Sequence, residues 1–197
     1  TVQWRNAEFI QSTVFQAAIL MLAADEKKLA ERFLTHLSES LSERSLLKLE
    51  SFLIELDDPH IQIRFGKRQA SMGNIMFNSY FAIHDMADYE WVVPLDLLLS
   101  IARRESEFDQ NATSSAGAMG LMQVMPIWKK EIGRPEDNLT NMETNLRYGC
   151  TILKHYLNKE KGNLIRALGR YNGSLGKTKY PEKVLTFWEK YWFVKHV

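Results

Sequence analysis

The chain contains almost no cysteine and no long uninterrupted apolar run. Cys150 is its only cysteine, so no disulfide can form within the 197 residues. The residues around Cys150 are typical of a helix, and we expect a buried structural thiol rather than a nucleophile. The longest apolar stretch, residues 14–24, is too short to cross a bilayer and includes Gln16, so it predicts a packed helix.

An excess of charge of one sign is also missing. The formal net charge is +1, with 25 Lys and Arg against 24 Asp and Glu, and no segment is rich in basic residues. This balance excludes nucleic acid as the main partner. The histidines are scattered without the spacing of metal ligands, so we expect neither a metal nor another cofactor. They are His36, His60, His84, His155 and His196.

Strand patterns are equally scarce, apart from a short hairpin considered for the loop 108–124. The sequence therefore predicts an all-α protein. A change of composition at Asp85–Val93 indicates a junction between an N-terminal helical region at 1–88 and a second domain at 89–197. In the first region Asp58 and Pro59 form a typical helix start. Helices are expected there at 3–24, 25–39, 42–56, 58–71 and 74–83.

The second domain is predicted to begin with a helix that starts at Pro94 and ends just after Glu105. A loop of small residues, a short helix at 127–132 and three longer helices follow. Thr140 and Glu143 form a capping box for the first of these, which runs to about residue 158. Asn163 caps the next, which ends at 171–173, and Pro181 starts the last. The last helix carries aromatic side chains that we expect to be core: Phe187, Trp188, Tyr191 and Trp192.

Glu105 is the most informative residue of this domain. Helical spacing places it on the same face as the apolar residues Leu95, Leu98, Leu99 and Ala102. The opposite stripe is polar: Asp96, Ser100, Arg103 or Arg104, and Glu107. Burial and the nearby helix C-terminus both favour the neutral acid, so Glu105 is predicted to hold its proton near neutral pH. A protonated carboxyl is what general-acid catalysis requires, although pairing with a core arginine is the simpler alternative.

Three motifs follow in order: Glu105-Ser-Glu-Phe108, Gly117-Ala-Met-Gly-Leu-Met-Gln-Val-Met-Pro126 and Arg170-Tyr-Asn-Gly-Ser174. With the helix start Asn145-Leu-Arg-Tyr-Gly149 between them, residues 90–193 resemble the soluble lytic transglycosylases of family 1. These enzymes have a goose-type lysozyme-like catalytic domain. More weakly, residues 58–67 are similar to the helical stretch that precedes this domain in larger members.

The resemblance implies cleavage of the β-1,4 bond between N-acetylmuramic acid and N-acetylglucosamine in peptidoglycan. Glu105 would be the acid and then the base, and the product would carry a 1,6-anhydro end. The implied substrate-binding residues are Ser106, Ser114, Gln123, Met125, Tyr171, Asn172 and Tyr180. Among them, the hydroxyl of Tyr171 would approach the catalytic carboxyl, and the amide of Asn172 would bind the substrate acetamido group.

Two positions depart from the family pattern. Arg170 stands where alanine is common, which suggests a more polar groove edge. The segment Lys177-Thr-Lys-Tyr-Pro181 replaces a motif that carries a glutamate and an arginine, although Tyr180 can serve as the family tyrosine. Two alternatives stay open: a lysozyme-like muramidase that uses water, and an inactive muropeptide-binding protein.

The resemblance also implies partners and a location. We expect glycan strands and muropeptides as ligands, the N-terminal helices as a surface for a protein partner, and a monomer. The implied location is the periplasm or cell envelope of a Gram-negative bacterium. Because the chain begins with Thr1 rather than Met, we expect a processed or trimmed form, with any signal peptide or anchor outside these residues.

Overall fold

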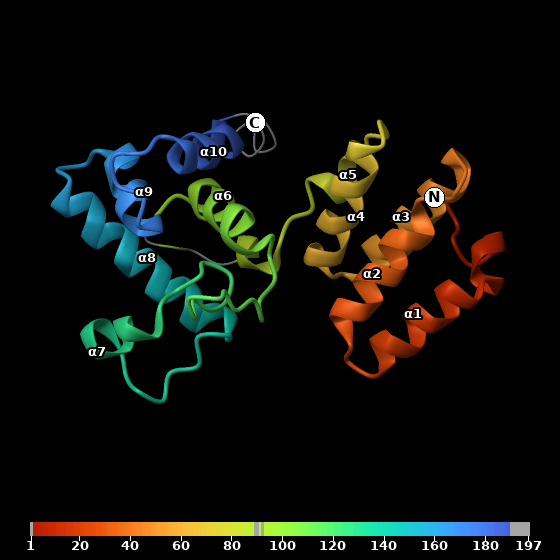
Figure 1. The fold of residues 1–197 in the computed structure, drawn as a ribbon, viewed down its shortest axis with the longest axis horizontal. Coiled ribbons are helices and arrows are strands. Elements are labelled where there is room, and N and C mark those ends of the chain that lie inside the picture. Colours follow the sequence, from red (N-terminus) through yellow and green to blue (C-terminus); the bar gives the residue numbers. More distant parts are fainter. Residues whose placement is uncertain (1, 89–90, 92, 190–197) are drawn as a thin grey trace. The chain divides into compact units, whose positions relative to one another are not determined.

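A computed structural model describes residues 2–88, 91 and 93–189, and the described residues form helices and loops without a β-strand (Figure 1). The predicted all-α class is confirmed. The chain divides into two compact units, Thr1–Ala82 and Ile83–Val197. This division lies just before the predicted junction at Asp85–Val93. Within the described residues, no helix combines the length and the apolar character needed to cross a membrane.

The first unit is a set of short helices around one apolar core. Residues from η1, α1, α2, α3 and α4 meet in this core, where Phe15, Leu34, Leu49 and Phe65 are nearly or fully buried. The elements are η1 (Glu8–Gln11), α1 (Thr13–Ala23), α2 (Lys27–Ser38), α3 (Glu43–Leu56), α4 (Pro59–Ser71) and α5 (Phe77–Tyr80).

The expectation of one continuous helix over residues 3–24 is wrong. Ser12 has an extended backbone, and its hydroxyl accepts a hydrogen bond from the Phe15 amide at 3.1 Å. This capping contact starts α1 afresh, because serine satisfies one of the unpaired amides at a helix N-terminus. The residues before it form only the 3-10 turn η1.

The predicted helix start at Asp58 is confirmed. The Asp58 carboxylate accepts a hydrogen bond from the Ile61 amide at 3.0 Å, and Pro59 occupies the first helical position. The chain then packs α4 tightly against α5. A Cβ atom at Gly66 would lie 2.6 Å from the Tyr80 amide nitrogen, so only glycine allows this approach. Helix α5 is shorter than the predicted 74–83.

The described part of the second unit contains two 3-10 turns and five α-helices. Helix α10 packs against α6 and α9, and α9 packs against α8. Cys150 is buried in α8, as predicted, and burial raises the pKa of its thiol to about 12. The elements are η2 (Asp85–Asp88), α6 (Leu95–Ser106), η3 (Pro126–Trp128), α7 (Lys129–Ile132), α8 (Met142–Lys159), α9 (Leu164–Asn172) and α10 (Lys179–Phe187).

Two helix starts differ from the sequence prediction. Asn141, not Thr140, caps α8, and its side-chain oxygen accepts from the Thr144 amide at 3.0 Å. The Thr140 hydroxyl is engaged elsewhere, because it donates to Asn138 at 2.7 Å. Helix α10 starts at Lys179, so Pro181 lies within the first turn, where a helix needs no amide donor. Of the predicted aromatic residues, Tyr191 and Trp192 lie outside the described residues.

The loop between α6 and η3 is held to α8 by one side chain. The Asn145 oxygen accepts from the Met122 amide, and its nitrogen donates to the carbonyls of Met119 and Leu139, all at 2.8 Å. A Cβ atom at Gly120 would lie 2.3 Å from the Asn145 nitrogen. In place of a regular hairpin, the loop has isolated bridges from Met119 to Thr113 and to Val124.

Candidate active site

Helix α6 presents Glu105 on its last turn. The predicted polar stripe of this helix is wrong at Ser100, which is buried. Of the two arginines offered for the stripe, Arg103 is buried and Arg104 is exposed. The Ser100 hydroxyl donates to the Asp96 carbonyl at 2.8 Å, and the Arg103 guanidinium lies 5.4 Å from the centre of the Phe187 ring. The buried hydroxyl thus bonds within α6, and the buried guanidinium packs against α10. Helix α6 is therefore buried on more sides than its pattern of polar and apolar residues predicts.

The chain turns sharply just after the carboxyl. Glu107 and the next residue, Phe108, adopt left-handed backbone angles with φ of 50° and 62°. Such angles are unfavourable for residues other than glycine, and two in succession are uncommon. The turn ends α6 at Ser106, so Glu105 is the second-last residue of the helix.

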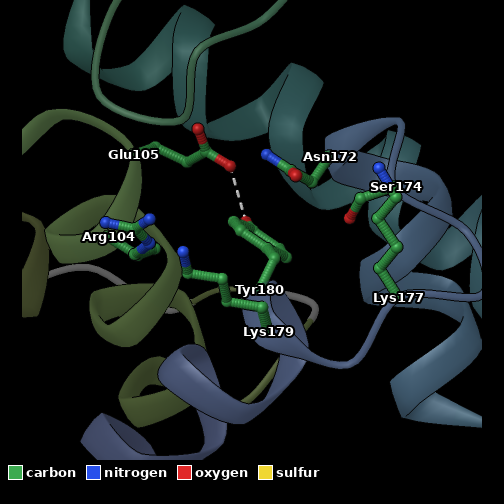
Figure 2. A pocket seen from close by; sticks show the side chains of 7 residues that line it. All are labelled: Arg104, Glu105, Asn172, Ser174, Lys177, Lys179 and Tyr180. Carbon is green, nitrogen blue, oxygen red and sulfur yellow. Dashed lines mark hydrogen bonds between the residues drawn. The ribbon is translucent and has the colours of Figure 1, made fainter.

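The Glu105 carboxyl is partly buried and bonded to a tyrosine of another helix. The Tyr180 hydroxyl donates to Glu105 Oε1 at 2.6 Å (Figure 2). Burial raises the pKa of Glu105 above its ordinary value of 4.5, while hydrogen bonds from Tyr180 and Asn172 and the charge of Arg104 lower it. The net direction is upward, so desolvation is the largest effect. Burial and the Glu105 charge in turn raise the pKa of Tyr180 well above its ordinary value.

A pocket of about 340 Å³ opens in front of this carboxyl (Figure 2). Glu105 is the only carboxylate among the residues that line it. The wall comes from α6, from the end of α9, from the loop that leads into α10, and from the first turn of α10. The lining residues are Arg104, Glu105, Asn172, Ser174, Lys177, Lys179 and Tyr180.

Three of the predicted site residues therefore meet in one place: Glu105, Asn172 and Tyr180. Tyr171 lies close enough for the Glu105 charge to raise its pKa, although burial is the larger cause. Its hydroxyl donates to the Met122 carbonyl at 2.8 Å. The phenol that bonds to the carboxyl is that of Tyr180, whereas the sequence assigned this approach to Tyr171.

The other predicted site residues lie outside the pocket wall. The buried Ser106 hydroxyl is 2.8 Å from the Leu121 carbonyl, so it ties α6 to the following loop. Ser114 accepts a hydrogen bond from the Ala118 amide at 3.0 Å. Gln123 has a positive φ of 51° and donates to the Gly120 carbonyl at 3.0 Å. These three side chains bond to backbone groups.

Met125 also lies outside the pocket wall. It sits at the start of η3 with 39% of its surface exposed.

Sequence reasoning did not assign four of the lining residues to the site: Arg104, Ser174, Lys177 and Lys179. The two lysines could have been assigned to the site from the segment 177–181, which departs from the family motif. Arg170, which was expected to make the groove edge more polar, instead pairs with Glu160, as does Arg166. Among the described residues, no group of three His, Cys, Asp or Glu side chains is arranged to hold a metal ion.

Comparison with known proteins agrees with this geometry. Residues 82–187 match the family model described as the transglycosylase SLT domain. Over 96 residues the chain is 34% identical to a transglycosylase of Enterobacteria phage PRD1, which covers 45% of this chain and 35% of that protein.

Solved structures of lytic transglycosylases share the fold. The 70-kDa soluble lytic transglycosylase in complex with bulgecin A superposes with a TM-score of 0.69 and 19% identity, covering 92% of this chain and 31% of that one. An inactive mutant of the lytic transglycosylase Slt from Pseudomonas aeruginosa gives a TM-score of 0.66 and 20% identity, with 90% and 30% covered. The 70-kDa enzyme of Escherichia coli gives 0.64 and 18%, with 91% and 32% covered.

The chain spans about a third of the length of these relatives. The family model, in contrast, covers more than half of the chain, from the end of the first unit to the end of α10. It includes every residue of the pocket wall. This chain therefore belongs to the transglycosylase SLT domain family.

Proposed function

We propose that the chain is a peptidoglycan lytic transglycosylase. It cleaves the β-1,4 bond between N-acetylmuramic acid and N-acetylglucosamine, and it leaves a 1,6-anhydro end on the muramic acid. The observation that carries this proposal is the single partly buried carboxyl of Glu105, whose pKa is raised and which faces a pocket.

Glu105 acts first as the acid. A raised pKa keeps the proton on the carboxyl to a higher pH than for an exposed glutamate, so the group can protonate the glycosidic oxygen. The bond from that oxygen to the anomeric carbon breaks, and positive charge develops on the sugar ring. Glu105 is then a carboxylate, which Tyr180 and Asn172 stabilise by hydrogen bonding.

The same carboxylate then acts as the base. It takes the proton of the 6-hydroxyl of muramic acid, and the oxygen closes onto the anomeric carbon. Protons and bonds balance, because the leaving sugar keeps the proton from Glu105, the 6-hydroxyl supplies Glu105 with another, and no water is consumed. An intramolecular hydroxyl has a high effective concentration, so the step needs little further help in positioning the attacking group.

The presence of one carboxyl in the pocket wall supports transfer within the sugar over hydrolysis. Glycosidases that hydrolyse their substrate generally use two carboxyl groups, one of which activates water or forms a covalent intermediate. Glu105 is the only acid among the residues that line the pocket. The Asn172 amide can hold the substrate acetamido group, because an amide offers both a donor and an acceptor.

The relatives support this substrate class. One solved neighbour is a lytic transglycosylase bound to bulgecin A, and the phage relative is named a transglycosylase. Peptidoglycan as a substrate places the activity of this chain at the bacterial envelope.

Mass spectrometry of digested sacculi tests the proposal. We expect muropeptides with 1,6-anhydro ends from the parent and almost none from the Glu105→Gln variant. Reducing ends would instead identify a muramidase that uses water. Equal wall binding by parent and variant without any products would identify an inactive muropeptide-binding protein.

A further inference from the structure

The pocket wall carries three cationic side chains against one carboxyl. Arg104 comes from α6, Lys179 is the first residue of α10, and Lys177 lies in the loop before it. Arg104 and Lys179 lie on one side of Tyr180, and Lys177 lies on the other (Figure 2). The whole chain has a net charge of only +1, so this concentration of positive charge is local.

None of these three cations forms an ion pair with another residue in the described part of the chain. Nearby arginines behave differently, since Arg166 and Arg170 on α9 both pair with Glu160. Glu105 is the only carboxyl among the residues that line the pocket with these cations, and it holds its proton over a wider pH range than an ordinary glutamate. Within the pocket wall, the rim therefore has no fixed counter-charge.

The position of Lys179 is electrostatically unfavourable for the fold. A helix N-terminus carries partial positive charge, so a cation in the first turn is destabilising there. Thr178, at the cap position, makes no side-chain hydrogen bond, and the only acidic residue of this first turn, Glu182, is exposed and lies outside the pocket wall. The first amides of the nine-residue helix α10 add to the positive potential on the same side of the pocket. A bound anion would reduce the positive potential on this side of the pocket.

We propose that the rim formed by Arg104, Lys177 and Lys179 binds a carboxylate of the glycan substrate, next to the bond that Glu105 cleaves. This inference rests on the proposed function. Peptidoglycan offers two sources of a carboxylate. One is the lactyl group of muramic acid, which is free where the stem peptide has been removed, and the other is the stem peptide itself.

Such binding couples substrate recognition to the state of the acid. The positive charge of Arg104 lowers the pKa of Glu105 in the free protein. A carboxylate held by the rim would screen that charge, and the pKa of Glu105 would rise. The acid would then be protonated most completely when an anionic strand occupies the pocket.

Binding measurements test the rim without requiring turnover. Isothermal titration in the Glu105→Gln background would use a tetrasaccharide with free lactyl carboxylates and the same sugar converted to methylamides. We expect about tenfold tighter binding of the carboxylate form, since two exposed charge contacts contribute at most about 1 kcal/mol each. Adding K177Q and K179Q should reduce this ratio to about one. Adding K183Q should preserve it, because Lys183 is an exposed lysine of α10 outside the pocket.

A stem-bearing tetrasaccharide separates the two sources, because its lactyl group is amide-linked. Lysine-dependent binding of that sugar alone assigns the site to a stem carboxylate, and binding of the stripped sugar assigns it to the lactyl group. A carboxylate preference that survives both lysine changes, or the absence of lysine-dependent binding for both the stripped and the stem-bearing sugar, overturns the rim. Failure of the proposed function would appear separately, as an absence of anhydro ends while the lysine-dependent preference persists.

Discussion

The protonation of Glu105 is set by opposing local effects. Burial raises its pKa, and the hydrogen bonds of Tyr180 and Asn172 together with the charge of Arg104 lower it. An acid that must give up a proton and later regain it needs both kinds of influence, because each form of the group must be accessible during the reaction. Changes at single residues should therefore move activity and pH dependence in defined directions.

Replacing Glu105 with glutamine removes the proton donor and keeps nearly the same shape. We expect the rate of anhydro-muropeptide release to fall by about 10²–10⁴-fold, the usual contribution of general acid–base catalysis. The melting temperature should fall little or not at all. Loss of cooperative melting would instead assign Glu105 a structural role, such as pairing with a core arginine.

The stability of the parent should depend on pH through the same residue. Because the pKa of Glu105 is higher in the folded than in the unfolded chain, the unfolded chain loses this proton first as the pH rises. The stabilising contribution of the neutral acid is fully present below the unfolded pKa and is lost as the pH passes the folded pKa. Glu105→Gln should therefore gain stability relative to the parent as the pH rises from about 4 to above the folded pKa, with no pH-dependent gain at lower pH. Melting curves across this range would measure the difference.

Replacing Tyr180 with phenylalanine removes a donor that lowers the pKa of Glu105. The alkaline limb of the pH–rate profile should move to higher pH, because the acid stays protonated longer. The maximal rate should fall, since the carboxylate that forms during the reaction loses a hydrogen bond.

Tyr171→Phe is the matched control for the Tyr180 variant. The Tyr171 hydroxyl donates to the Met122 carbonyl, so its removal should lower the free energy of unfolding by about 1 kcal/mol. The alkaline limb of the pH–rate profile should stay where it is in the parent. If the alkaline limb moved equally in both variants, its position would not depend on the hydrogen bond between Tyr180 and Glu105.

At the scale of elements, capping side chains in the sequence predict two helix starts correctly. Asp58 and Asn163 cap α4 and α9 as expected. Errors arise where two capping residues compete, as with Thr140 and Asn141, or where a cap interrupts an apolar run, as Ser12 does before α1. In both places local hydrogen bonding overrides the pattern of apolar residues.

The site shows a similar limit. Glu105, Asn172 and Tyr180 could be placed together from their motifs. The cations of the rim could not, because they meet only when α10 packs against α6 and α9. The same packing buries Arg103, one of the two arginines that the helical pattern of α6 offered for its polar face. Tertiary contacts between distant segments leave little trace in local sequence patterns.

Substitution of Gly120 should show how strongly the loop is held to α8. Gly120→Ala introduces a left-handed alanine at φ 76° and a clash with the side chain of Asn145. We expect a loss of about 2–4 kcal/mol in the free energy of unfolding, from backbone strain plus overpacking.

Gly117→Ala provides a comparison, because its φ is 88° and nothing lies within 4 Å of the added Cβ. That change should cost only about 1–2 kcal/mol, from strain alone. Denaturant unfolding measures both, and equal losses would mean that Asn145 yields without cost.

At the scale of the whole molecule, the core of the first unit is made only of residues before Ala82. The lining residues of the pocket all belong to the second unit. We therefore expect a fragment of residues 83–197 to fold alone and to release anhydro muropeptides from sacculi. Circular dichroism melting and product analysis would check this, and a fragment without a cooperative transition would contradict it. That the first unit offers a surface to a protein partner, and that the protein is a monomer, stay predictions.

The bond between Glu105 and Tyr180 joins positions that lie 75 residues apart. During translation, Glu105 leaves the ribosome well before Tyr180, which donates the hydrogen bond to its carboxyl. A nascent or prematurely ended chain can thus contain every residue of α6 and still lack a finished reaction centre.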